Sequence, residues 1–317
     1  TWAEDAAADE GKVLNIYCWN EEFKSRLTDH YPGYEEVDGT HGKIGDVDVV
    51  WNITPNENNA YQNNLDETLL KHADASADDK IDLFLVEADY APKYVDSDYT
   101  MPIKDLGITD SDISKQYKYT QDVVTDSDGN LKGLSWQGCP GVLFYNREAA
   151  KEVLGTDDPD KVQEALSTWD KFDKVAEQAA AKGYKMLSGY DDSYRVFSNN
   201  VSAPWVDSNN KIVIDDNIMK WVDQTKKYTD KGYNNKSSLW DSTWAADQGP
   251  SGKVFGFFYS TWGINFTLLG NSLATPVKEG GKEEVGNGIY GDYAVCEGPQ
   301  SYYLSLIHIS EPTRRTP

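Results

Sequence analysis

Short apolar runs alternate with amphipathic stretches along the first third of the chain. We expect three runs rich in strand formers to be β-strands, at 12–19 (KVLNIYCW), 45–52 (GDVDVVWN) and 81–86 (IDLFLV). Between them, 21–31 and 57–73 place apolar side chains at helical spacing. The third run is almost continuously apolar, which is typical of parallel strands covered on both faces. This order predicts βαβ units within an α/β sheet.

The pattern changes in segment 122–136, where an Asp-Gly pair stands between two short extended runs. This arrangement predicts a β-hairpin. A calcium loop at 126–130 is disfavoured, because its glycine comes too early for an EF-hand and no glutamate follows at the required distance. Beyond the hairpin, the apolar pattern predicts strands at 141–146, 186–189 and 254–259 and helices at 168–182 and 217–231.

The change of pattern also suggests how the chain divides. We expect two α/β lobes, the first formed by 12–125 with a return segment at 263–297, and the second by 126–262 with 298–303. The acidic, aperiodic residues 1–11 are expected to be a solvated linker. The tail, 304–317 (LSLIHISEPTRRTP), is similar to the translated read-through of an adapter used in sequencing libraries. We expect it to be an artefact that takes no part in the fold.

The composition of the chain argues against several classes of partner and site. The 317 residues include 53 acids and 30 strong bases, a net charge of −23, so nucleic acids and anionic lipid surfaces would be repelled. The apolar runs are all shorter than the roughly 18 residues that span a bilayer. The three cysteines, Cys18, Cys139 and Cys296, form no metal-binding motif, and no common catalytic or nucleotide-binding motif is present. We therefore expect no catalytic residue, no metal and no cofactor.

Aromatic and polar residues follow several of the predicted strands. Twenty Tyr and 10 Trp against 9 Phe favour a half-wet surface such as a cleft, although a single ring is as easily part of a core rim. Ligands of α/β sheets bind beyond the carboxyl ends of strands. An aromatic ring covers the apolar face of a sugar, and amides or carboxylates bind its hydroxyls. The candidate ligand-binding residues are Trp19, Asn20, Glu21, Glu87, Asp89, Tyr90, Trp136, Gln137, Tyr190, Asp191 and Trp262.

Five segments in order resemble the extracellular solute-binding proteins of carbohydrate ABC transporters, the two-lobed type similar to maltose-binding protein. The resemblance covers roughly 12–303. One departure is Ser135-Trp136, which stands where the family usually has Gly-Pro. The segments are LNIYCWNEEF, DKIDLFLVEADYAPKYV, DSDGNLKGLSWQGCPGVLFYNREAAKEVLG, ALSTWDKFDKVAEQAAAKG and GKVFGFFYSTWG.

The resemblance implies a periplasmic-binding-protein-like fold of type II, with a hinge and a cleft between two lobes. It implies a receptor that binds a sugar or oligosaccharide, performs no chemistry on it and delivers it to the permease of an ABC importer. Such a receptor is a monomer outside the cytoplasm, a lipoprotein on the cell surface of a Gram-positive bacterium or a periplasmic protein. The family's C-terminal helices have no counterpart before the adapter-like tail, so we expect the second lobe to be incomplete.

Two alternatives remain open from the sequence. A polyamine receptor has a related fold, and a cationic amine also binds between aromatic rings and carboxylates. A secreted glycoside hydrolase would use tryptophans and a pair of carboxylates. With 53 acids in the chain, some pair always looks well placed, so the sequence identifies no particular catalytic pair.

Overall fold

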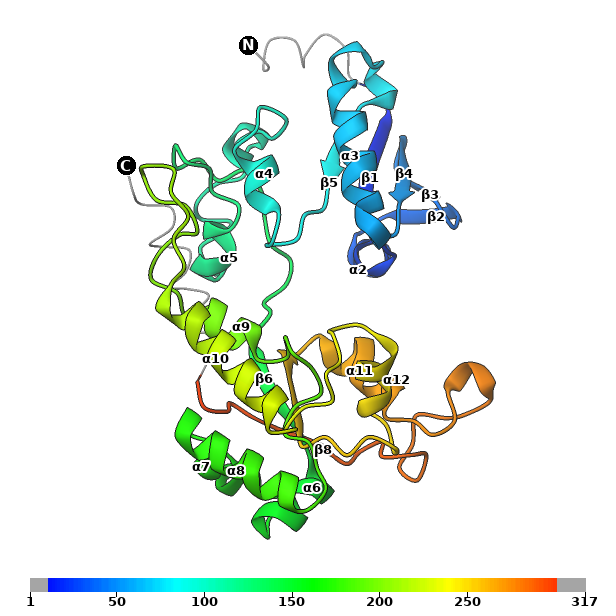
Figure 1. Ribbon diagram of the computed structural model, residues 1–317. Coiled ribbons are helices and arrows are strands. Elements are labelled where there is room, and N and C mark those ends of the chain that lie inside the picture. Colours follow the sequence, from blue (N-terminus) through cyan, green and yellow to red (C-terminus); the bar gives the residue numbers. More distant parts are fainter. Residues whose placement is uncertain (1–10, 301–317) are drawn as a thin grey trace. The chain divides into compact units, whose positions relative to one another are not determined.

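The computed structural model describes residues 11–300 and divides into two compact units (Figure 1). Within the described residues, unit 1 comprises 11–116 and 123–134, and unit 2 comprises 117–122 and 135–300. Each unit contains a sheet and helices, so the prediction of two α/β lobes is confirmed. The expected linker and tail lie outside the described residues, apart from Gly11.

Unit 1 is a five-stranded mixed sheet with helices on both faces. The strand order is β2-β3-β4-β1-β5, with β1 parallel to β4 and β5 and with β2, β3 and β4 antiparallel. The central β1–β4 pairing aligns Val13 with Asp48 and Cys18 with Ile53. The elements are β1 (Val13–Cys18), α2 (Glu22–His30), β2 (Tyr34–Asp38), β3 (His41–Ile44), β4 (Val47–Ile53), α3 (Ala60–Leu70), β5 (Leu83–Phe84) and α4 (Ala91–Val95).

Alternation along β1 divides the core of unit 1 between the two sheet faces. Ile16 and Cys18 pack with Val49 and Trp51 on the face that α2 covers. Tyr17 points to the opposite face, which α3 covers with the side chains Tyr61, Leu65 and Leu69. Successive strand residues point to opposite faces, so one short strand supplies both layers of the core.

Unit 2 is built on a three-stranded antiparallel sheet of order β7-β6-β8. Leu143 and Tyr145 of β6 pack against α6, α7 and α8 in the largest buried cluster of the unit. The elements are α5 (Lys118–Asp122), β6 (Gly141–Asn146), α6 (Arg147–Leu154), α7 (Pro159–Ala165), α8 (Trp169–Ala181), α9 (Tyr194–Ser198), α10 (Asp216–Asp230), α11 (Ser242–Asp247), β7 (Gly256–Ser260), the π-helix η5 (Ile264–Leu268), α12 (Leu269–Asn271) and β8 (Tyr293–Cys296).

The segment 263–297 lies in unit 2, whereas we expected it to return to the first lobe. Its strand β8 pairs with β6, aligning Leu143 with Cys296 and Asn146 with Tyr293. At the end of β8, Gly298 and the Gln163 side chain of α7 exchange two hydrogen bonds of 2.8 and 2.9 Å. The pairing of β8 with β6 assigns the segment 263–297 to unit 2. The hydrophobic pattern of the sequence does not reveal this pairing.

Two predicted strands are shorter than expected. The run 81–86 forms only the two-residue β5 at the edge of the sheet, and its Leu83 is exposed. The Asp82 carboxylate accepts a hydrogen bond of 2.7 Å from the Asn15 amide next to this edge. Segment 186–189 is not a strand. Gly189 forms an isolated bridge with Ser237, and Lys185, directly before the segment, forms one with Val254.

The hairpin prediction at 122–136 agrees with the structure. Thr125 and Leu131 form an antiparallel bridge across the turn, where Gly129 has a φ of 85°. The Asp126 carboxylate accepts from the amides of Asp128 and Asn130 at 3.1 and 2.7 Å, and these hydrogen bonds close the turn. No helix within 11–300 is long and apolar enough to cross a membrane.

Candidate functional site

The carboxyl ends of β1 and β5 in unit 1 are tied together by one tyrosine of α3. The buried Tyr61 hydroxyl lies 2.6 Å from the carbonyl of Leu85 and 3.1 Å from that of Tyr17. Burial raises the pKa of Tyr61 far above its ordinary value, so the hydroxyl keeps its proton. The loops that follow β1 and β5 therefore leave the sheet from one fixed edge.

Three candidate residues follow β1 at this edge. The Trp19 ring is half-buried and packs edge-on against Tyr61, with centroids 5.5 Å apart and an interplanar angle of 76°. The Asn20 side chain accepts a hydrogen bond of 3.0 Å from the Glu22 amide, at the start of α2. Glu21 is exposed. Trp19 and Asn20 thus have structural roles as well as a position at the sheet edge.

The other three candidates of unit 1 follow β5. The Glu87 carbonyl accepts from the amides of Tyr90 and Ala91 at 3.2 and 2.9 Å, and Glu87 and Asp89 are exposed. Tyr90 packs in the same cluster as Trp19. Its hydroxyl is buried without a hydrogen-bond partner among the described residues. Burial, followed by the nearby charge of Glu87, raises the pKa of Tyr90 above its ordinary range.

In unit 2, Tyr190 and Asp191 are bound to the loop 237–241. The Tyr190 amide donates to the Ser237 carbonyl at 3.0 Å. The Asp191 carboxylate accepts from the Leu239 amide at 3.0 Å. Leu239 precedes Trp240, so these bonds fix two predicted residues beside an aromatic ring that we did not predict.

Trp262 lies in a row of aromatic rings, which we call the aromatic ladder and define as Trp244, Trp240, Trp262 and Phe266. Trp240 meets the buried Trp244 edge-on at 5.1 Å and stacks on Trp262 at 5.9 Å with an interplanar angle of 13°. Phe266 meets Trp262 edge-on at 5.7 Å. Trp240, Trp262 and Phe266 are 54%, 37% and 64% exposed. The ladder therefore runs from the core of unit 2 to three exposed rings.

Trp240 and Phe266 are the residues that the sequence analysis missed. Trp240 comes just before Asp241, whose carboxylate caps α11 by accepting from the Trp244 amide at 2.7 Å. An aromatic residue directly before a capping aspartate predicts a packing contact with the first turn of the helix, but it does not predict that the ring stays exposed.

Trp136 and Gln137 lie in the loop that leads into β6. Trp136 is exposed, and the Gln137 carbonyl accepts from the Ser135 hydroxyl at 2.8 Å. The structure thus groups six of the eleven candidates at the sheet edge of unit 1 and three, Tyr190, Asp191 and Trp262, around the aromatic ladder of unit 2. Their role in ligand binding stays a prediction.

A buried polar network underlies the Tyr190–Asp191 loop. The Asp192 carboxylate is 4% exposed and accepts from the Ser188 amide at 2.9 Å, while its other oxygen has no partner among the described residues. Burial raises the pKa of Asp192 to about 7. The Ser188 hydroxyl lies 2.7 Å from both Ser237 and Asp247, which joins this loop to 237–241 and to the end of α11.

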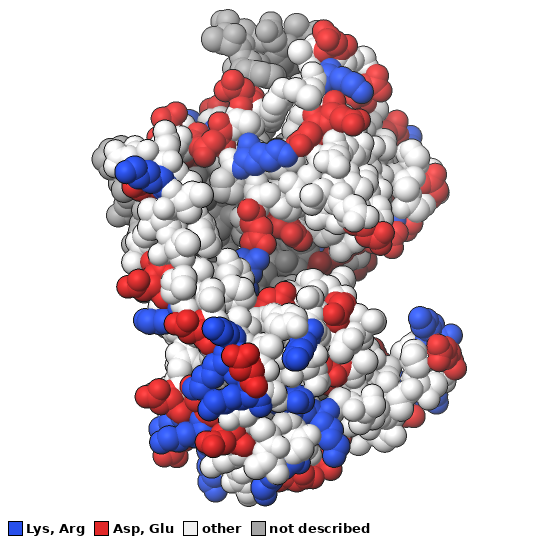
Figure 2. Space-filling model, in the orientation of Figure 1, with Lys and Arg blue, Asp and Glu red and all other residues white. Residues whose placement is uncertain are grey.

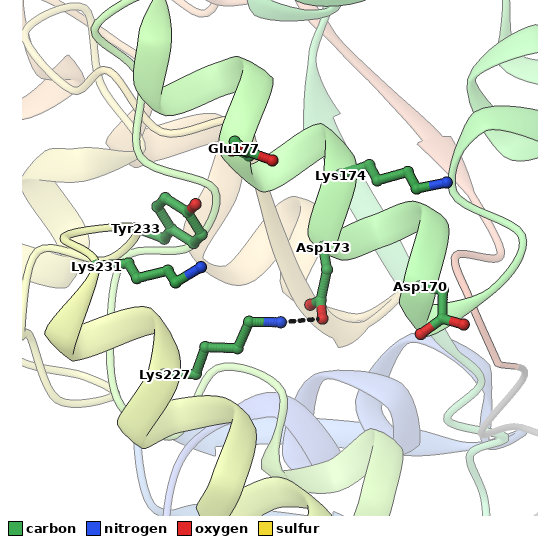
Figure 3. A pocket seen from close by; sticks show the side chains of 7 residues that line it. All are labelled: Asp170, Asp173, Lys174, Glu177, Lys227, Lys231 and Tyr233. Atoms are coloured by element: carbon green, nitrogen blue, oxygen red, sulfur yellow. Dashed lines mark hydrogen bonds and ion pairs between the residues drawn. The ribbon is translucent and has the colours of Figure 1, made fainter.

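A groove of about 340 Å³ lies between α8 and α10 (Figure 3). Asp173 of α8 pairs with Lys227 of α10 at 2.6 Å and accepts from the Tyr228 hydroxyl. Acids and lysines are intermixed over this face of unit 2 (Figure 2). This compensated charge is typical of a solvated helix–helix groove. The lining residues are Asp170, Asp173, Lys174, Glu177, Lys227, Lys231 and Tyr233.

Within 11–300, no group of three or more His, Cys, Asp or Glu side chains is placed to hold a metal ion. Within the described residues, Cys18, Cys139 and Cys296 form no disulfide bond. Burial raises the pKa of Cys18 to about 11 and that of Cys296 to about 12, which keeps these two sulfurs protonated and unreactive.

Solved structures share the fold of the chain. A crystal structure of an extracellular solute-binding protein of family 1 matches with a TM-score of 0.66 at 14% identity, over 91% of this chain and 67% of that one. The sugar-binding protein MalE of Xanthomonas citri matches with a TM-score of 0.59 at 14% identity, over 95% and 75%.

A third structure is the ABC-transporter-associated binding protein from B. animalis subsp. lactis Bl-04 in complex with β-1,6-galactobiose. It matches with a TM-score of 0.57 at 16% identity, over 95% of this chain and 72% of that one. The chain thus spans about two thirds to three quarters of the length of these structures. No curated protein sequence matches it significantly.

A family model supplies the classification. The model described as bacterial extracellular solute-binding protein matches residues 36–289, which is most of the chain. The family is one of extracellular binding proteins, and the fold described above agrees with it. The chain therefore belongs to the bacterial extracellular solute-binding protein family.

Proposed function

We propose that the chain is the receptor of an ABC importer and binds a sugar or oligosaccharide. The observation that carries the proposal is the aromatic ladder of unit 2, with Trp240 and Trp262 exposed beside Asp191. An exposed indole face covers the apolar face of a sugar ring, and a neighbouring carboxylate accepts hydrogen bonds from its hydroxyls. Structural neighbours whose descriptions name β-1,6-galactobiose, lacto-N-biose and maltose support the same ligand class.

The sheet edge of unit 1 has the same kind of side chains. Trp19 and Tyr90 supply ring surface there, and Glu21, Glu87 and Asp89 are exposed carboxylates. We propose that this edge contributes further contacts to the ligand. The protein binds the sugar and carries out no reaction on it, and its macromolecular partners are the permease subunits of the importer. A monomeric state and a lipid anchor to the membrane belong to the same proposal.

A thermal-shift screen tests the ligand class. The probes are maltose, β-1,6-galactobiose, lacto-N-biose, acarbose, D-mannitol and ribitol, with putrescine and spermidine as the polyamine arm. A ligand present at 100 times its Kd stabilises the folded state by about 2.7 kcal/mol, which raises the Tm by several degrees. We expect a saccharide to do so and the polyamines to have no effect.

Chromatography of the same saccharide mixtures after incubation separates binding from hydrolysis. We expect every saccharide to be recovered intact. A Tm rise with spermidine alone would replace the proposal by a polyamine receptor, and release of monosaccharides would replace it by a glycoside hydrolase.

A further inference from the structure

A segment of unit 2, residues 273–289, forms an arm between α12 and β8. It includes the 3₁₀ turn η6 (Val277–Glu279), and Figure 1 draws it in orange, extending away from the sheet of the unit. The Val277 and Val285 side chains are 57% and 80% exposed, so apolar burial contributes little to the stability of this arm. Its closed shape therefore depends mainly on hydrogen bonds.

The side chain of Asn287 closes the arm. Its Oδ1 accepts a hydrogen bond of 2.9 Å from the Thr275 amide. Its Nδ2 donates to the carbonyls of Thr275 and Lys282, at 2.8 and 3.0 Å. We call these three hydrogen bonds the clasp. A carboxamide supplies the acceptor and the two donors that the clasp uses, whereas a carboxylate would supply acceptors only.

The residue after Asn287 is a glycine that the base of the arm requires. Gly288 has a φ of 64°, and a Cβ there would collide with the Ser272 carbonyl. That carbonyl accepts from the Ile289 amide at 2.9 Å. Within 11–300, the Gly288 amide itself makes no hydrogen bond. Close packing thus places an Asn-Gly pair, with an unbonded amide, at the base of the arm.

This Asn-Gly pair, the only one in the sequence, has a reactivity of its own. The Gly288 nitrogen can attack Cγ of Asn287, because glycine has no side chain to shield it. A bond forms between these two atoms and the Cγ–Nδ2 bond breaks. The amide proton of Gly288 passes through water to Nδ2, which leaves as ammonia. Water then opens the succinimide ring at either carbonyl, and the product is aspartate or isoaspartate.

We propose that Asn287 is a site of spontaneous deamidation and that the modification opens the arm irreversibly. In the product, a carboxylate oxygen replaces the Nδ2 group, so it faces the carbonyls of Thr275 and Lys282 with no proton to share. Two hydrogen bonds become repulsive contacts between oxygens. Glu283 and Glu284 lie in the same arm, and a further negative charge among them is disfavoured. The inference does not depend on the ligand of the protein.

The clasp also controls the rate of the modification. The Asn287 side chain must release its three hydrogen bonds before it can turn towards the Gly288 nitrogen. The reaction therefore proceeds through local opening of the arm, and it is faster at alkaline pH because the attacking nitrogen must lose its proton. Since the product cannot form the clasp again, each molecule that reacts leaves the closed population permanently.

Peptide mapping by mass spectrometry tests the site. The full chain is incubated at pH 9, with a parallel sample in urea, and the mass change from amide to acid is followed at every asparagine. We expect Asn287 to react first in the folded protein. Unfolding should speed its reaction by about tenfold or more, since three hydrogen bonds keep the open arm a minor population. A faster reaction at another asparagine, such as Asn271, or equal rates with and without urea would overturn the inference.

Hydrogen exchange and limited trypsin digestion test the opening. Asn287→Asp carries the side chain of the product, and Asn210→Asp is the matched control, because it adds the same charge to an exposed turn outside the arm. We expect 273–289 to exchange about tenfold faster in Asn287→Asp, with faster cleavage after Lys278 and Lys282.

The control should behave as the wild type does, and the amides of β6 and α8 should keep their protection in both variants, which shows that unit 2 is folded. Wild-type protein aged at pH 9 should show the same opened arm as Asn287→Asp. Exchange and cleavage of the arm at wild-type rates in Asn287→Asp would overturn the inference, as would the same increase in Asn210→Asp.

Discussion

At the scale of single residues, several polar side chains near the candidate site have a structural partner. The Asp191 carboxylate accepts a hydrogen bond from the Leu239 amide, and the Asn20 side chain accepts one from the Glu22 amide in the first turn of α2. Asp192 differs, because one of its carboxylate oxygens is buried without a partner among the described residues. A charge at that position lacks the solvation that water would give, which is why burial raises the pKa of Asp192 to about 7.

The raised pKa of Asp192 predicts how stability depends on pH. The unfolded carboxyl titrates near pH 3.9, roughly the model-peptide value, so the folded state binds this proton more tightly. The resulting stabilisation is fully present below about pH 4 and is lost as the pH rises to about 7. Asp192→Asn removes the charge, so it should be more stable than the wild type at pH 8 by about 2 kcal/mol or more.

Urea denaturation of the wild type and of Asp192→Asn, at several pH values between 5 and 8, measures the difference in their free energies of unfolding. The gap between the two should narrow towards pH 5, where the wild-type carboxyl is protonated in the fold. Asp191→Asn is the matched control, because the neighbouring carboxylate is only partly buried and accepts a hydrogen bond from the Leu239 amide. Two pH profiles that run parallel would show that Asp192 does not titrate in this window.

The two tryptophans at strand ends should respond differently to truncation. Trp262→Ala removes a ring exposed at the aromatic ladder, so we expect about a thirty-fold loss of saccharide affinity with a near-normal melt. Trp19→Ala removes the edge contact with the buried Tyr61, so it should lower the stability of unit 1 by about 1–3 kcal/mol. Calorimetric titration and thermal melts, run side by side, compare the two effects. A strongly lowered Tm in Trp262→Ala would show that this ring belongs to the core.

The sequence indicated the positions of residues that depend on the local chain, and their role in ligand binding stays a prediction. Trp262 follows a buried strand, and Tyr190 and Asp191 lie where a loop was expected. Trp240 could not be predicted in this way, because its exposure depends on a positive φ that hydrogen bonds from distant segments impose. Tertiary contacts of this kind have no signature in the spacing of residues.

At the scale of elements, the long periodic segments were the most predictable. The helix expected at 168–182 is α8, with Phe172, Val175, Ala176 and Ala179 on its buried face. The strand expected at 141–146 is β6, with the same bounds. The edge strand β5 and segment 186–189 were overestimated, because short apolar runs do not show whether a neighbouring strand is available to pair.

The N-cap of α8 offers a test at this scale. The Thr168 hydroxyl accepts a hydrogen bond of 3.2 Å from the Lys171 amide, which is otherwise without a helical partner. Thr168→Ala should lower the free energy of unfolding by about 1 kcal/mol, whereas Thr168→Ser, which keeps the hydroxyl, should cost much less. Chemical denaturation followed by circular dichroism measures both. Equal losses in the two variants would mean that the hydroxyl does not cap the helix.

At the scale of the whole molecule, each unit has a core of its own. Leu65 lies in a cluster made of unit 1 residues, and Phe172 lies in one made of unit 2 residues. The sequence indicated two α/β lobes from the change of pattern after residue 121. It placed 263–297 in the wrong lobe, because the pairing of β8 with β6 joins segments about 150 residues apart, roughly a domain length, and leaves no local signal.

The separate cores predict separate responses to core truncation. Leu65→Ala leaves a cavity beneath the unit 1 sheet and should cost about 2–5 kcal/mol, and Phe172→Ala should cost about 3–5 kcal/mol in unit 2. Hydrogen exchange measured by mass spectrometry locates the loss. In Leu65→Ala the amides of β1, β4 and α3 should exchange faster, while those of β6 and α8 keep their protection; Phe172→Ala should give the opposite pattern. Because local opening draws only on the contacts of the unit that opens, faster exchange throughout the chain in either variant would show that the two cores unfold as one cooperative unit.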